Sequence, residues 1–148
     1  LRVAAPPAFL YSLNRDHVGA EAVLELWRMR SKLLYRIGNQ IAGWSIPVVH
    51  ASVFGSAARG DGDAASDIDV LLIHSEQLDP EDQVWRSQCD VLAADILKWT
   101  GNPASLVELP RPRKAAWPAF LRSALGKEIE LDSIAVAGLR FDELRVSR

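Results

Sequence analysis

Two aspartates that stand one residue apart, Asp67 and Asp69, follow a turn of small residues that begins at Gly55 and Ser56. On a strand, side chains two residues apart point to the same face, with their backbones about 6.6 Å apart. Two carboxylates in that position repel each other unless a cation lies between them, and Mg²⁺ prefers a few carboxylates together with phosphate oxygens. Backbone N–H groups at such a turn bind phosphate. The combination predicts a site for a divalent cation and a phosphorylated ligand.

A third acidic residue is expected, because a two-metal site needs bridging and flanking ligands. Glu108 is the best candidate, since it is the one acid in an apolar run that predicts a strand. A lone glutamate there either lies at an exposed edge or points into the site. Asp61 and Asp63 are rivals by proximity, but their glycine-rich surroundings favour solvated turn residues.

The elements that position these residues follow from the periodicity of the apolar residues. Steps of three and four residues predict a long helix from His17 to Gly43. Runs of β-branched and apolar residues predict three strands, over 48–54, 68–73 and 105–109. The fold class expected is therefore α/β (α+β), with a small mixed sheet flanked by helices and a long N-terminal helix.

The remaining elements are predicted from caps and breakers. Asp79, followed by a proline, is expected to cap a helix that ends at Gly101. Further along the chain, we expect a helix over 115–125 that Gly126 ends, a weaker strand over 128–132 with an extension to 136 left open, and a helix over 141–146.

Composition and length limit the classes of protein. The 148 residues suffice for one domain, and the formal net charge of -2 gives no footprint for direct binding of DNA or RNA. The single cysteine, Cys89, excludes an internal disulfide. No membrane-crossing run or signal peptide is found in the sequence, so we expect a cytoplasmic protein. Residues 1–45 are expected to form a leader and a long helix, with a role as a linker from a further domain left open, and 46–148 the functional domain.

The order of motifs resembles the nucleotidyltransferase fold of the DNA polymerase β superfamily. That family combines Gly-Ser, then Asp-x-Asp on the next strand, then an acid on a later strand. The string Gly-Ser-x-x-Arg-Gly, five residues, Ser-Asp-Ile-Asp resembles the minimal nucleotidyltransferases of bacteria. The resemblance covers roughly residues 48–110. It departs from the family where Glu108 replaces an aspartate found in many relatives, and where the chain is too short for the helical acceptor domain of the larger antibiotic-modifying relatives.

The resemblance implies transfer of a nucleoside monophosphate from a nucleoside triphosphate (NTP) to an acceptor hydroxyl of a small molecule or protein. Asp67, Asp69 and Glu108 would hold Mg²⁺ in a two-metal site, and Glu108 could also take the proton of the hydroxyl. Gly55 and Ser56 would bind the β and γ phosphates.

Two further residues have open roles in that picture. Arg59 would either reach the triphosphate or pair with a nearby aspartate, two roles that suit arginine equally. Ser66 is expected in the nucleotide-binding group, where it would orient Asp67 or the turn.

Two alternatives to an enzyme stay open at this point. One is a nucleotide-sensing regulatory module without catalysis, and the other is an antitoxin-like partner of a second protein. The apolar residues of the helix over 17–43 also leave open a homodimer. The base of the NTP and the acceptor are not defined by the sequence.

Overall fold

The computed structural model describes residues 2–5, 8–63 and 65–144 of the chain. It divides into two compact units, Leu1–Lys32 and Leu33–Arg148. The predicted boundary between residues 45 and 46 stays a prediction.

The first unit contains an antiparallel hairpin and the beginning of the long helix. Strand β1 (Arg2–Ala5) pairs with β2 (Ala8–Tyr11), and the helix α1 (Ala20–Ala42) starts in this unit and ends in the second. The long N-terminal helix is thus confirmed, with its first turn three residues later than the expected start at His17.

The second unit is built on a mixed sheet with the strand order β5-β4-β3-β6. The strands are β3 (His50–Phe54), β4 (Ile68–His74), β5 (Ala104–Pro110) and β6 (Ile134–Gly138). Strand β3 pairs antiparallel with both β4 and β6, whereas β4 and β5 run parallel. The three runs of β-branched and apolar residues therefore become the three adjacent strands β3, β4 and β5, as expected.

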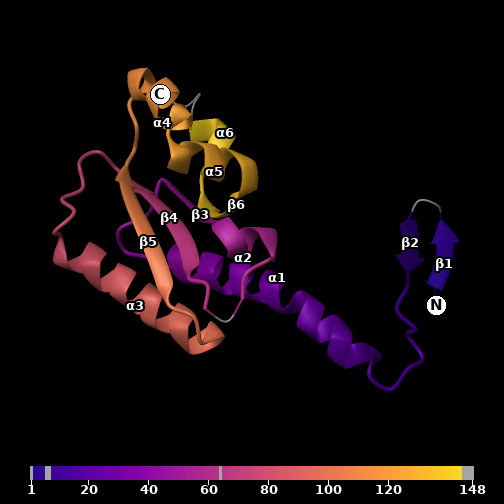
Figure 1. The fold of residues 1–148 in the computed structure, drawn as a ribbon. Helices are drawn as coiled ribbons and strands as arrows, with labels where there is room; N and C mark the ends of the chain where they lie inside the picture. Colours follow the sequence, from indigo (N-terminus) through magenta and orange to yellow (C-terminus); the bar gives the residue numbers. More distant parts are fainter. Residues whose placement is uncertain (1, 6–7, 64, 145–148) are drawn as a thin grey trace. The chain divides into compact units, whose positions relative to one another are not determined.

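Helices cover the two faces of this sheet (Figure 1). One face packs on residues 33–42 of α1 and on α3 (Gln83–Thr100) around a core that includes Ile37, Val70 and Leu92. The other face packs on three short helices, α4 (Trp117–Arg122), α5 (Ala124–Asp132) and α6 (Phe141–Leu144), with Leu71 and Ile129 in its core. Along β4, alternate residues thus enter alternate cores, which fixes the face on which each polar residue lies.

The helix α3 is capped by a different aspartate from the one expected. Asp82 accepts hydrogen bonds from the backbone amides of Val84 at 2.8 Å and Trp85 at 3.1 Å. Asp79 instead accepts from the amide of Glu81 at 3.0 Å, inside the preceding turn. The predicted cap is wrong because the Asp79 carboxylate already accepts a hydrogen bond within the turn that precedes the helix.

The predicted strand over 128–132 is wrong, because this segment belongs to α5. The hydroxyl of Ser123 accepts from the amide of Gly126 at 3.0 Å and caps the helix. Gly126 does not end a helix: a Cβ there would lie 2.0 Å from the carbonyl oxygen of Phe120, so the glycine permits close packing of α5 on α4. The strand follows as β6. Of the helix expected over 141–146, α6 forms the described part, and residues 145–146 lie outside the described residues.

Burial of His50 predicts a loss of stability in acid. The side chain is fully buried, its Nδ1 lies 2.7 Å from the carbonyl of Leu139, and its buried Nε2 has no hydrogen-bond partner among the described residues. Burial lowers the pKa of His50 below its usual 6.5. Below about pH 6.5 the unfolded chain binds a proton that folded His50 does not, so stability falls with decreasing pH by up to about 1.4 kcal/mol per unit.

Denaturant unfolding between pH 5 and 8 measures this dependence. The variant His50→Asn is expected to show a flatter slope of unfolding free energy against pH, whereas the exposed-site control His17→Asn retains the slope of the parent. Equal slopes in the parent and His50→Asn would contradict the assignment.

Candidate active site at the end of strand β3

The chain turns sharply where β3 passes into the short helix α2 (Gly55–Arg59). Gly55 has a φ of 67°, a conformation that favours glycine, and it is buried. A Cβ on Gly55 would lie 2.6 Å from Oδ2 of Asp69, so the carboxylate rests directly against the glycine backbone. The turn and the second aspartate are therefore brought together.

Asp69 reaches this position through the register of the sheet. It stands opposite Phe54, the last residue of β3, in the antiparallel pair, and opposite Ser105 in the parallel pair with β5. Burial raises the pKa of the Asp69 carboxyl, and the carboxylates of Glu128 and Asp67 raise it further. A hydrogen bond from Ser105 and the charge of Arg59 act in the opposite direction. The site is thus acidic and short of positive charge, which favours binding of a cation.

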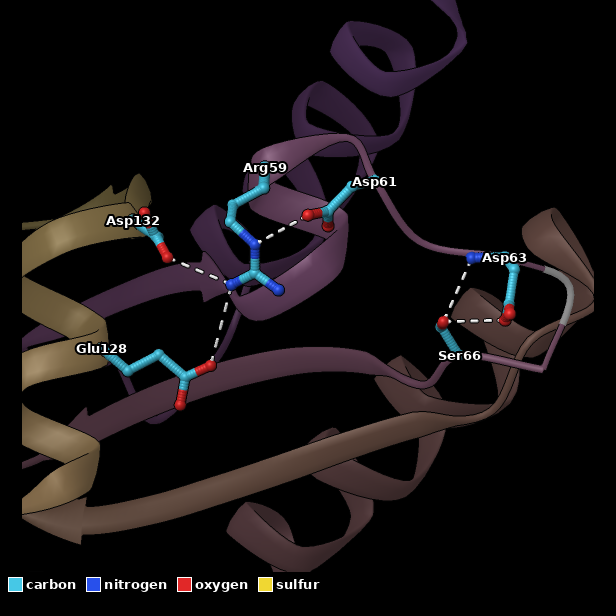
Figure 2. Close-up of polar contacts among 6 residues, drawn as sticks. All are labelled: Arg59, Asp61, Asp63, Ser66, Glu128 and Asp132. Carbon is cyan, nitrogen blue, oxygen red and sulfur yellow. Dashed lines mark hydrogen bonds and ion pairs between the residues drawn. The ribbon is translucent and has the colours of Figure 1, made fainter.

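Ser56, in α2, and Ser66 and Asp67, in the loop between α2 and β4, lie in different settings. The hydroxyl of Ser56 lies beside Gly62, where an added Cβ would come within 3.0 Å of it. Ser66 accepts from the amide of Asp63 at 3.1 Å and donates to the Asp63 carboxylate at 2.9 Å (Figure 2). Its hydroxyl therefore closes the loop, one of the two roles expected for it. Asp67 is exposed, one residue before β4 begins.

Arg59 is surrounded by carboxylates at the end of α2 (Figure 2). Its Nε donates to Asp61 at 3.1 Å, and its Nη1 lies 3.1 Å from Asp132 and 3.9 Å from Glu128. Both latter residues belong to α5. Of the two roles left open by the sequence, the structure shows Arg59 in ion pairs, one of them with the nearby aspartate Asp61.

The position of Glu108 requires a correction, because its side chain lies on the opposite face of the sheet from Asp69. The indole Nε1 of Trp85 donates to Oε2 of Glu108 at 2.6 Å, and Arg86 pairs with Oε1 at 3.1 Å. Both partners belong to α3. The neighbouring residues of β5 agree with this placement. Leu106, which shares a face of the strand with Glu108, packs in the core under α3, whereas Val107 packs in the core under α5. The structure does not bring the three predicted carboxylates together.

A structural role for Glu108 is testable. The Glu108→Ala variant leaves the indole N–H of the fully buried Trp85 without its partner, and we expect a loss of about 1–3 kcal/mol in unfolding free energy. Glu108→Gln keeps an acceptor and should lose less. Thermal or denaturant unfolding measures both. Neither variant should change nucleotide affinity, and a selective loss of nucleotide binding in a stable Glu108→Gln would return the residue to the site.

Three residues near the site were missed by the sequence reasoning. Ser105 binds Asp69, Glu128 lies near both Asp69 and Arg59, and Asn102 holds the loop before Asp67. Ser105 follows from the parallel register, and Glu128 was hidden because its segment was predicted as a strand. The Gly-Asn-Pro sequence predicts a turn in which the side chain of Asn102 forms a hydrogen bond, but it does not identify the residue that accepts this bond.

The side chains near the turn limit how a metal ion could be bound. Among the described residues no group of three or more His, Cys, Asp or Glu side chains is arranged to hold a metal ion. Asp69 lies against the turn, and the charge of Asp67 is near enough to raise the pKa of Asp69. Mg²⁺ commonly binds one or two carboxylates while substrate phosphates supply further oxygens. None of the described helices combines the length and the apolar character that crossing a membrane requires.

Comparison with known proteins supplies the family. The family described as nucleotidyltransferase domain matches residues 39–131, which is more than half of the chain. A comparison with curated protein sequences finds no match. Among solved structures, a mutant of the toxin–antitoxin pair MntA–HpeT is similar, with 15% identity over 79% of this chain and 81% of that chain and a TM-score of 0.46. A toxin–antitoxin with AMP-PNP has 21% identity over 79% of each chain and a TM-score of 0.43.

The chain therefore belongs to the nucleotidyltransferase domain family, as its motifs predicted. The match spans the turn at Gly55, both Asp67 and Asp69, and the whole of β5.

Proposed function

We propose that this protein transfers a nucleoside monophosphate from an NTP to an acceptor hydroxyl with the help of Mg²⁺. The observation that carries the proposal is the contact between the Gly55 backbone and the Asp69 carboxylate, at the turn where β3 passes into α2. A carboxylate that rests against a glycine turn supports the proposal, because a cation bound to phosphate would suit both the carboxylate and the backbone of the turn. Membership of the nucleotidyltransferase family supports the same reaction class.

The residues would divide the work of binding as follows. Asp67 and Asp69 would hold Mg²⁺ together with phosphate oxygens, and the bound ion would neutralise charge that develops on the triphosphate. The backbone and the hydroxyl of Gly55 and Ser56 would orient the phosphates beyond the reacting one. The acceptor oxygen would form a bond to the α-phosphorus while the bond to the leaving pyrophosphate breaks, and the hydroxyl proton would pass to solvent water. We propose one metal held in this way, because Glu108 lies on the other face of the sheet.

Arg59 has a conditional role in this proposal. In the structure its guanidinium is paired with Asp61 and Asp132, so contact with a phosphate would require exchange of these carboxylates for phosphate oxygens. Arginine is suited to both partners because its planar fork matches carboxylate and phosphate alike. Ser66 is already bonded to Asp63, and we assign it to the loop that carries Asp67 rather than to the nucleotide.

Two samples of the same NTP, one labelled at the α phosphate and one at the γ phosphate, test the reaction. The protein is incubated with Mg²⁺, a panel of small-molecule hydroxyl acceptors and candidate proteins, and an NTP labelled either at the α or at the γ phosphate. Nucleotidyl transfer moves the α label to the acceptor and releases the γ label as pyrophosphate. Transfer of the γ label instead would replace the proposal with phosphoryl transfer. Nucleotide binding without movement of either label would favour the sensor that the sequence left open.

A further inference from the structure

Asp67 has no described side-chain hydrogen bond that fixes it, yet both peptide groups that flank it are held. The carbonyl of Ser66, in the peptide bond before Asp67, accepts from Nδ2 of Asn102 at 2.7 Å. The amide of Ile68, in the peptide bond after Asp67, donates to the carbonyl of Pro103 at 2.8 Å. The backbone that carries the Asp67 side chain is therefore held from the corner that joins α3 to β5.

Asn102 also reaches further back into the same loop. Its Nδ2 lies 3.2 Å from the carbonyl of Asp63, so one amide nitrogen ties both ends of the segment from 63 to 66. Both acceptors are carbonyl oxygens, which require a donor with two N–H groups. An asparagine side chain supplies such a donor, whereas an aspartate of the same size supplies none.

The corner itself is well held. The amide of Asn102 donates to the Thr100 hydroxyl at 3.0 Å, and that hydroxyl lies 2.8 Å from the carbonyl of Ile96 in the last turns of α3. Gly101 ends the helix with a φ of 81°, and the ring of Pro103 restricts the backbone that follows. The helix α3 packs on the sheet through fully buried residues such as Ile96. Because Asn102 follows directly after this helix, the packing of α3 fixes where Asn102 lies.

We propose that Asn102 is a positioning residue, which sets the Asp67 carboxylate for the cation that accompanies the nucleotide. This inference rests on the proposed function. A residue that orients a ligand without touching the metal typically changes metal affinity by 10–100-fold when it is replaced. The Asn102→Ala variant should therefore need at least about tenfold more Mg²⁺ to reach half-maximal nucleotide binding.

The experiment titrates Mg²⁺ into the full chain with a fluorescent ATP analogue, in the parent, Asn102→Ala and Asn102→Asp. The control Asn39→Ala makes the same change at an exposed position of α1 and should keep the Mg²⁺ midpoint of the parent. Asn102→Asp should shift the midpoint at least as far as Asn102→Ala, because its carboxylate faces two carbonyl oxygens. Far-UV circular dichroism confirms folding, and Asn102→Ser replaces any variant that does not fold.

A second comparison separates positioning from general stability. If Asn102 acts through Asp67, its replacement should have little further effect on nucleotide affinity in an Asp67→Asn background. Additive losses, or a Mg²⁺ midpoint equal to that of Asn39→Ala, would overturn the inference while leaving the proposed function intact. If the parent shows no Mg²⁺-dependent nucleotide binding, the proposed function fails and this inference fails with it.

Discussion

Replacement of Asp69 by asparagine should lower the rate of nucleotidyl transfer by about a thousandfold, since a metal ion supplies several kcal/mol of transition-state stabilisation. Asparagine is similar in size and keeps an oxygen, but it lacks the charge that holds a divalent cation. Asp69 is half-buried against Gly55, so no exposed carboxylate can replace it from solvent without movement of the turn. The rate is measured with the α-labelled NTP and an acceptor that accepts label from the parent.

The control for this prediction is Asp90→Asn, which makes the same change at an exposed position of α3. It should transfer label at the rate of the parent. Removal of the negative charge at Asp69 should not destabilise the fold, because burial and the neighbouring carboxylates of Glu128 and Asp67 already oppose that charge. A folded Asp69→Asn variant that retains transfer within a few-fold of the parent would contradict the assigned role.

The second large effect is expected for Gly55→Ala, which should abolish nucleotide binding. The substitution puts a side chain in the left-handed region, at a cost of about 1–2 kcal/mol. In addition, the new Cβ would lie 2.6 Å from Oδ2 of Asp69, so either the carboxylate or the turn must move. Isothermal titration with a nonhydrolysable NTP analogue and Mg²⁺ measures the loss, and unfolding measures the strain.

Gly101→Ala is the matched control, because Gly101 also has a positive φ, of 81°, but a Cβ there meets nothing within 4 Å. It should carry the conformational cost of a positive φ alone, so the two variants are compared by their unfolding free energies. If Gly55→Ala loses no more stability than Gly101→Ala and still binds nucleotide, the contact of Gly55 with Asp69 is not functional.

The sequence was sufficient for the elements whose pattern is local. The apolar runs that became β3, β4 and β5 and the periodicity of α1 needed no knowledge of the tertiary structure. The Gly-Ser turn and the Asp-x-Asp strand lie side by side as expected, because consecutive strands joined by a short segment readily pair in a sheet.

The face of Glu108 could not be derived in this way. Leu106 and Val107 are both apolar, so alternation along β5 does not distinguish the two faces. The parallel register, in which Leu72 stands opposite Glu108 and Asp69 opposite Ser105, decides it. A shift of one residue would have turned Glu108 to the other face. The segment of α5 was predicted as a strand for a similar reason. Gly126 was interpreted as the end of a helix, and only its contact with the Phe120 carbonyl in the folded chain explains why a glycine stands there.

The most direct test of the account is the affinity for an NTP, measured with and without Mg²⁺, in the parent and in Asp69→Asn. If the carboxylates of Asp67 and Asp69 and the turn at Gly55 together hold a cation and a triphosphate, Mg²⁺ should tighten binding by the parent at least about tenfold and leave Asp69→Asn unaffected. Binding by the parent that does not respond to Mg²⁺, or an equal response in both proteins, would contradict it.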